Sequence, residues 1–222
     1  MNILLWETGF APYKANIVKY EVGPSSIANG SFIPPKSLFP KMFDSDVGQR
    51  QITLRLDFVG TDENDAVTMM SSLTALFRQG VDIKLPDNYF YFCTLDRIGK
   101  AFQVAPWIVQ QTFTLSGFRH GPLKTHYLST TGFITVDGNY DTEAIFEIST
   151  ADLSVTVNGI TINNIGGNIV IDGMAKTVTQ NGINKFKDTN LTEFPRLKPG
   201  VNQITIIGDA ITVTVKYYPI YL

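Results

Sequence analysis

The chain has 222 residues, 44% of them hydrophobic and 17% charged, which is enough for one large domain or two small ones with real cores. Its 18 basic and 20 acidic residues give a net charge of -2, which argues against the basic surface that nucleic-acid binding requires. A single cysteine, Cys93, excludes an internal disulfide and a zinc site built from cysteines, and no apolar run is long enough to span a membrane. The start of the chain carries Glu7 and no basic segment, so we expect no signal peptide and a protein kept in cytosol-like conditions.

The first half of the chain is predicted to contain strands and one helix. Residues 23–40 include four prolines and many small polar residues, and we interpret them as a loop or an extended arm. Residues 52–58 alternate apolar and polar side chains, which predicts a half-buried strand. Three further strands are predicted at 81–85, 89–95 and 109–115.

The one helix is predicted at residues 63–79. Asp62 is of a residue type favoured at the N-cap, and Glu63 and Asp65 suit the positive end of the helix dipole. The dipole accounts for this acidic cluster without a catalytic role. Gly80 fits the position where a positive φ ends a helix. Apolar residues recur at steps of three and four on one predicted face: Val67, Met70, Leu73, Leu76 and Phe77.

From residue 130 onward the chain is predicted to form a β-sandwich of about 90 residues. Tight turns are indicated by Asn158-Gly159, Asp172-Gly173 and Asn181-Gly182, because these pairs supply the positive φ angles of two-residue hairpins. The polar stretch 121–131 is the predicted linker, which divides the chain into domains 1–126 and 127–222. The strands are expected at 153–157, 160–163, 168–171, 174–179, 201–207 and 210–218.

A search for catalytic chemistry finds little. The two histidines, His120 and His126, lie in the predicted linker, where we expect them to be exposed, and they are too few for a metal-dependent hydrolase. Cys93 follows an aromatic strand, where a buried inert thiol is expected. No nucleophile elbow, HExxH or phosphate-binding loop is present. The sequence therefore predicts no catalytic, cofactor-binding or metal-binding residue.

One pattern of acidic residues allows two interpretations, a calcium-binding loop or a polar hairpin. Asp137, Asn139, Asp141 and Glu143 fall at alternate positions, as at the start of a calcium-binding loop. The loop would require Gly at 142 and Glu at 148, where this chain has Thr and Ile. We therefore favour a polar hairpin between strands at 133–136 and 144–148.

Sequence motifs in both halves of the chain resemble those of a known family. Residues 194–205, FPRLKPGVNQIT, resemble the FPxLxPGxNxI turn that closes the second domain of phage distal tail (Dit) proteins. Residues 217–222, YYPIYL, are similar to the aromatic last strand of that family, with Ile220-Tyr221 where many relatives have Arg-Trp. Residues 48–56 resemble the family's G-R-x-I strand. Chemically the turn is inert, because its prolines fix φ and Gly200 permits the bend.

The resemblance implies a mainly β protein, with an N-terminal β-sandwich carrying one α-helix and a β-hairpin, and a C-terminal galectin-like β-sandwich. It implies that domain 1–126 forms a homohexameric ring that continues the tail tube, with domain 127–222 outside it. The role implied is a non-enzymatic hub at the distal end of a long, non-contractile tail. The implied partners are the major tail tube protein and the tail-associated fibre or lysin protein, with no cofactor, metal, membrane or specific nucleic acid. The implied location is the tip or baseplate of the virion tail, and the host cytoplasm during assembly.

Two other classes of function stay open. A carbohydrate-binding module for the host cell surface would stack sugars on aromatic rings, for which Tyr140, Tyr217, Tyr218 and Tyr221 are the candidates. A glycoside hydrolase or lysin would need paired carboxylates in a cleft, whereas the acids here fall mostly in turns or at the helix start. The short turns predicted in the second domain leave no room for an arm that clasps receptor-binding proteins.

Overall fold

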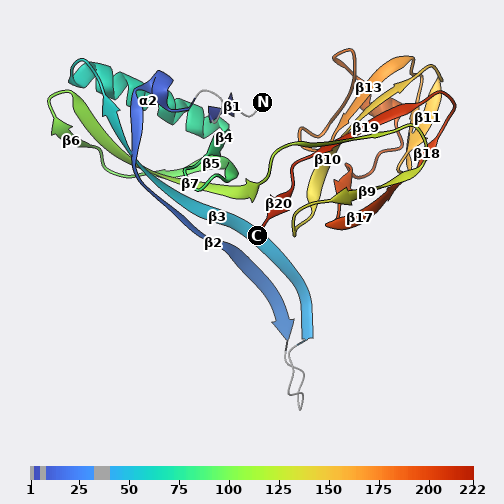
Figure 1. Ribbon diagram of the computed structural model, residues 1–222, viewed down its shortest axis with the longest axis horizontal. Coiled ribbons are helices and arrows are strands. Elements are labelled where there is room, and N and C mark those ends of the chain that lie inside the picture. The colour runs from blue at the N-terminus through green and yellow to red at the C-terminus, as the bar shows by residue number, and fades with distance from the viewer. Residues whose placement is uncertain (1–2, 6–8, 33–40) are drawn as a thin grey trace. The chain divides into compact units, whose positions relative to one another are not determined.

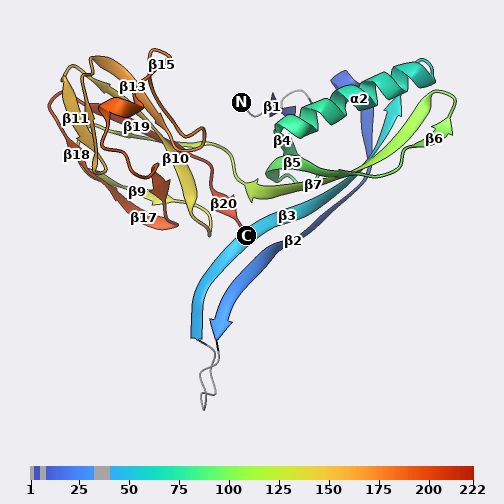
Figure 2. The ribbon, with the colours of Figure 1, turned by 180° about the vertical axis from the view of Figure 1, so that it is seen from behind.

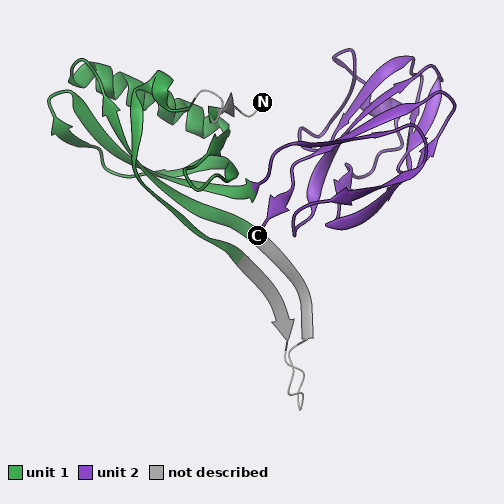
Figure 3. Ribbon diagram, viewed as in Figure 1, with its two compact units in different colours: residues 1–119, 222 green, residues 120–221 purple. Residues whose placement is uncertain are grey.

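A computed structural model describes residues 3–5, 9–32 and 41–222, and the chain divides into two compact units. Unit 1 comprises residues 1–119 and 222, and unit 2 comprises residues 120–221 (Figure 3). The division thus falls between Arg119 and His120, whereas the sequence analysis places a domain boundary after residue 126. The chain is mainly β with a single long helix, which confirms the predicted fold class.

Unit 1 is a β-sheet with a helix against one face (Figures 1 and 2). Its strands follow the order β1-β4-β5-β7-β3-β2, and β6 pairs with β7. Leu54, Leu56 and Phe58 of β3 are fully buried and point into the core, while the intervening residues point outward. The elements are β1 (Ile3–Leu4), a 3-10 turn (Ala11–Tyr13), β2 (Ala15–Phe32), β3 (Lys41–Val59), α2 (Glu63–Gln79), β4 (Val81–Lys84), β5 (Phe90–Ile98), β6 (Phe102–Ala105) and β7 (Ile108–His120).

Helix α2 has the predicted bounds. The Asp62 carboxylate accepts a hydrogen bond from the backbone N–H of Asp65 at 2.9 Å, which caps the first turn. Phe77 packs edge-to-face on Phe113 with ring centroids 5.1 Å apart, which ties the last turn to β7. Gly80 ends the helix with a φ of +86°. Val67 differs from the prediction, because it lies on the exposed side of the helix.

Strands β2 and β3 form a ribbon that extends beyond the sheet (Figures 1 and 2). They pair from Ala15↔Phe58 to Phe32↔Lys41, but β3 pairs with β7 only over residues 50–59. Past the Ser25↔Arg50 pair, each strand therefore has only the other as a partner among the described strands. Of the two predicted alternatives for 23–40, a loop or an extended arm, the loop is wrong up to residue 32, because cross-strand pairing overrides the local turn composition. Residues 33–40 lie outside the described residues.

Unit 2 places its strands in two groups around one core. One sheet has the order β15-β14-β13-β10-β19-β8, with β16 added to β10, and five further strands form the sets β12-β11-β18 and β17-β9. The elements are β8 (Lys124–Leu128), β9 (Gly132–Val136), β10 (Thr142–Thr150), β11 (Ser154–Val157), β12 (Ile160–Asn163), β13 (Gly167–Asp172), β14 (Thr177–Gln180), β15 (Ile183–Asn184), a 3-10 turn (Phe186–Asp188), β16 (Arg196–Leu197), β17 (Gly200–Ile204), β18 (Ile206–Ile207), β19 (Thr212–Tyr217) and β20 (Ile220–Tyr221).

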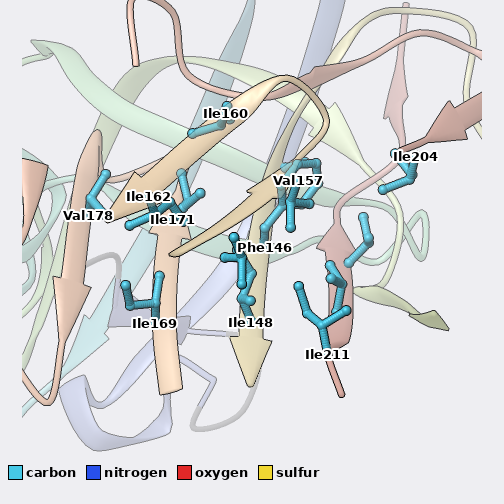
Figure 4. Packing of buried hydrophobic residues seen from close by; sticks show 14 of the residues in the cluster. Phe146, Ile148, Val157, Ile160, Ile162, Ile169, Ile171, Val178, Ile204 and Ile211 are labelled. Carbon is cyan, nitrogen blue, oxygen red and sulfur yellow. The ribbon is translucent and has the colours of Figure 1, made fainter. Parts of the chain in front are cut away.

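The core of unit 2 is built from alternate residues of these strands (Figure 4). Phe146 and Ile148 of β10 and Ile169 and Ile171 of β13 are at most 1% exposed, and Val157 of β11 is fully buried. In β10 and β13 the residues between the buried ones point outward, which is the period of two expected for strands with one buried face.

Two of the three predicted tight turns have the expected geometry. Asn158-Gly159 has φ angles of +51° and +79°, and Asn181-Gly182 has +50° and +79°. The Asp172-Gly173 prediction is wrong, because residues 173–176 form a longer turn in which the Asp172 carboxylate accepts the N–H groups of Met174 and Ala175. Strand β14 therefore begins at Thr177.

The predicted hairpin between 133–136 and 144–148 is also wrong. Strand β9 pairs with β17, while β10 has β13 on one side and β19 on the other over residues 145–149. Because both edges of β10 are occupied, the connection at 137–141 leads from one set of strands to the other. The predicted linker at 121–131 likewise contains strand β8, which pairs with β19.

Candidate interaction surfaces

The two histidines are packed inside unit 2. His120 is only 1% exposed, its Nδ1 lies 2.7 Å from the Gly121 carbonyl oxygen, and its ring meets Tyr218 edge-on at 5.0 Å. The prediction of an exposed linker histidine is therefore wrong for His120. His126 is half-buried, with its ring parallel to that of Tyr217 at 5.8 Å. Packing against these tyrosine rings gives both histidines a structural role.

Cys93 is buried in β5, as predicted. It is 4% exposed, and burial, with the nearby Asp82, raises the pKa of its thiol far above the usual range. The thiol therefore stays protonated at neutral pH and is not an activated nucleophile.

Two of the acidic residues at 137–143, Asp137 and Glu143, are paired with cations. Lys124 Nζ lies 3.1 Å from the Asp137 carboxylate, and this hydrogen bond raises the pKa of Lys124. Glu143 forms an ion pair with Lys176 and has Arg196 Nη2 at 3.9 Å. Within residues 3–5, 9–32 and 41–222, no three His, Cys, Asp or Glu side chains come together as a metal site would require.

The tyrosines suggested as sugar platforms are differently placed. Tyr217 is 1% exposed, and its hydroxyl donates to the Thr135 carbonyl oxygen and accepts from the Asp137 N–H, both at 3.2 Å. Burial also raises the pKa of Tyr217. A buried ring cannot stack on a sugar, which removes Tyr217 from the candidates. The sequence analysis did not single out Tyr127 and Phe133, which are 74% and 68% exposed.

The motif at 194–204 is a structural clip. The Asn202 side chain holds the turn, because its Oδ1 accepts the Lys198 N–H at 3.0 Å and its Nδ2 donates to the carbonyl oxygens of Lys198 at 2.7 Å and Gly200 at 3.0 Å. Gly200 has a φ of +90°, which a residue with a side chain rarely adopts. Leu197 and Ile204 are buried in the core on either side. Each of these residues has a packing or backbone role and none is reactive.

Unit 1 exposes apolar side chains at the end of its sheet around β6. Phe102 and Val104 are more than half exposed, and Trp107 and Ile98 are nearly so. On the ribbon side of the sheet, β2 exposes Val18. No helix among the described residues is long and apolar enough to cross a membrane. The described part of unit 1 thus presents exposed strands and apolar side chains.

The comparisons with known proteins agree with a tail component. The family described as the C-terminal domain of the siphovirus-type tail component matches residues 161–221, a stretch that includes the structural clip. No curated protein sequence matches the chain significantly.

Two solved structures share the fold over nearly the whole chain. The crystal structure of the SPP1 Dit protein, described as a paradigm of the hub adsorption apparatus of phages that infect Gram-positive bacteria, matches with a TM-score of 0.67 and 13% identity, covering 96% of both chains. A chain of the phage p2 baseplate in its activated, strontium-containing conformation matches with a TM-score of 0.61 and 10% identity, covering 91% of this chain and 90% of that one.

The chain is a two-unit β protein whose residues 161–221 match the siphovirus-type tail component and whose fold is that of the SPP1 Dit protein. In the sequence of residues 161–221 and in the fold of nearly the whole chain, the protein is thus similar to the phage distal tail, or Dit, proteins, which confirms the resemblance of its motifs to that family.

Proposed function

We propose that this protein is a non-enzymatic hub of a long phage tail, in which unit 1 of six copies closes a ring. The ring joins the major tail tube protein to the tail-associated fibre or lysin protein, and the virion tail tip is its location. The observation that carries this proposal is the agreement in fold with the SPP1 Dit protein over 96% of both chains. The tail-component match at 161–221 supports it independently from sequence.

The ribbon of β2 and β3 supports assembly through unit 1. These strands have 18 and 19 residues, whereas strands in globular domains usually have about 5 or 6. Beyond the Ser25↔Arg50 pair the ribbon has two strands, and a two-stranded ribbon is only marginally stable in water. We therefore infer that the ribbon lies against a neighbouring copy, which stabilises it.

The charge of unit 1 is compatible with close packing of identical copies. Residues 1–119 contain 11 Lys or Arg and 11 Asp or Glu, which gives a net charge of 0. Identical neutral units do not repel each other, and net neutrality favours association. A neutral ring also has no strong field that would retain DNA passing through it.

Unit 2 is proposed to lie at the periphery and to clasp no receptor-binding protein. Between its named elements the longest stretch is 189–195, and the other connections are shorter. A clasping arm would need a long excursion, which these connections do not contain. Adhesion to the host is then a task of other tail components.

The experiment is a version of the full chain whose ribbon is shortened. Replacing residues 26–49 by Asn-Gly joins Ser25 to Arg50, which already face each other, by a two-residue turn. We expect the shortened chain to keep the thermal midpoint of the wild type, because β3 pairs with β7 only from residue 50 onward. In light scattering, with tube and fibre partners present and their masses subtracted, the wild type should reach the mass of six copies and the shortened chain should not. Rings of unchanged stability from the shortened chain would contradict the role of the ribbon.

A further inference from the structure

The segment from Asp96 to Trp107 is an exposed excursion at the end of the unit 1 sheet. It contains the end of β5, all of β6 and the connection to β7. Every residue in it is exposed except Ala105, which is half-buried. Strand β6 buries neither of its faces, so it adds nothing to the core of its own unit. Four large apolar side chains are exposed in this excursion: Ile98 by 44%, Phe102 by 55%, Val104 by 58% and Trp107 by 50%.

The excursion is nevertheless held in place by hydrogen bonds. Gly99 N–H donates to the Thr112 carbonyl oxygen at 2.8 Å, and Gln111 Nε2 donates to the Gly99 carbonyl oxygen at 2.6 Å. The Trp107 carbonyl oxygen accepts the Gly60 N–H at 2.9 Å. Gln103 Nε2 donates to Glu63 Oε2 of helix α2 at 3.0 Å. An apolar surface that is ordered before binding loses little conformational entropy when a partner covers it.

We infer that the excursion 96–107 is the seam at which a second copy of this chain docks, an inference that rests on the proposed ring. Exposed apolar strands at a sheet edge are a liability in a free protein and are usual at binding surfaces. Among the described strands, β6 pairs with β7 alone, so its other edge is open to a partner. A ring requires two unlike surfaces on each copy. In this part of the sheet the strands lie in the order β6-β7-β3-β2, so the opposite edge, β2, supplies the second surface.

The charges favour a second copy as the occupant. The excursion carries Asp96, Arg97 and Lys100, a net charge of +1. Strand β2 exposes the apolar Val18, and next to it Lys19 and Glu21 form an ion pair at 2.5 Å with no net charge. The two surfaces therefore combine apolar contact with no accumulation of like charge.

The test compares exposed apolar residues of the excursion with equally exposed ones in unit 2. Phe102→Ser and Val104→Lys change the excursion, and Phe133→Ser and Val201→Lys make the same changes at side chains that are 68% and 71% exposed in β9 and β17. The mass of each full-length variant is measured by light scattering over a dilution series, with and without the tube and fibre partners. Thermal unfolding verifies that each variant is folded, which we expect because all four side chains are on the surface.

We expect both excursion variants to weaken ring formation at least tenfold and both unit 2 variants to assemble as the wild type does. If the excursion variants keep the wild-type ring but lose binding to the tube or fibre protein, the surface belongs to that partner and the inference is wrong. Rings and partner binding that are both unaffected would likewise overturn it while leaving the proposed function intact. A wild type that never exceeds the mass of one chain under any condition would instead contradict the proposed function, and the inference with it.

Discussion

The Asn202 side chain bonds both the N–H and the carbonyl oxygen of Lys198, at 3.0 Å and 2.7 Å, and so closes the turn that launches β17. The amide thus serves as hydrogen-bond partner for both backbone groups of Lys198. This explains why a motif without reactive groups contains an asparagine at this position. The turn also places Leu197 and Ile204 in the core of unit 2.

Asn202→Ala is expected to lower the free energy of unfolding by about 1–3 kcal/mol, because it removes an acceptor and a donor from one turn. Asn202→Asp is the control, since its carboxylate keeps the acceptor for Lys198 N–H and lacks the donor. Because its second oxygen would face the carbonyl oxygens of Lys198 and Gly200 in place of the donor, this variant should also be less stable than the wild type. Urea unfolding of the full chain, followed by circular dichroism, measures both. An alanine variant as stable as the wild type would show that the clip contributes nothing.

Gly117→Ala should destabilise unit 1 strongly. A Cβ at this position would lie 2.4 Å from the Phe92 carbonyl oxygen and 2.7 Å from Cys93 Cβ, so β5 and β7 would have to separate. We expect a loss of about 1–3 kcal/mol or more, as for overpacked cores. Gly99→Ala is the matched control, because its nearest atoms lie at 3.3 Å and 3.4 Å.

Tryptophan fluorescence measures this loss specifically, since both tryptophans, at positions 6 and 107, precede residue 119. Equal midpoints for the two alanine variants would contradict the close approach of the strands at Gly117.

The ion pair between Lys14 and Asp65 should make the stability of unit 1 depend on pH. The Lys14 ammonium, 2.7 Å away, and the Thr61 N–H lower the pKa of Asp65 below its usual value. The folded-state pKa is therefore below the unfolded one, so the pair stabilises the fold above about pH 4 and ceases to do so as the pH falls through the folded-state value. Lys14→Met should melt below the wild type at pH 7, and the difference should shrink as the pH falls.

The control for this prediction is Asp65→Asn, which has no carboxyl group at this position. The pH dependence that comes from the ion pair between Lys14 and Asp65 should be absent in it. A difference between wild type and Lys14→Met that is as large at pH 2.5 as at pH 7 would show that the lysine acts by packing alone.

Local patterns predicted the helix and most strands of the core, because these elements bury one face. Helix α2 has its cap at Asp62 and its end at Gly80, and both signals can be read from the sequence. The Asn158-Gly159 turn can likewise be read from the sequence, and strand β12 begins directly after it. The tail-component signature was recognisable because its residues are fixed by the backbone of one turn.

The missed features depend on contacts between distant segments. Strand β6 was not predicted, because a strand with no buried side chain has no alternation to detect. The length of β2 depends on its pairing with β3 and not on its own prolines and serines. The burial of His120 depends on Tyr218, which lies almost a hundred residues away in the chain.

The mass of the assembled protein tests the central claim most directly. Six copies of 24.6 kDa make a ring of about 148 kDa, and the proposed function predicts this mass by light scattering, for the chain alone or after the tube and fibre partners are added and their masses subtracted. A mass of 24.6 kDa with both partners present at micromolar concentration would contradict the account.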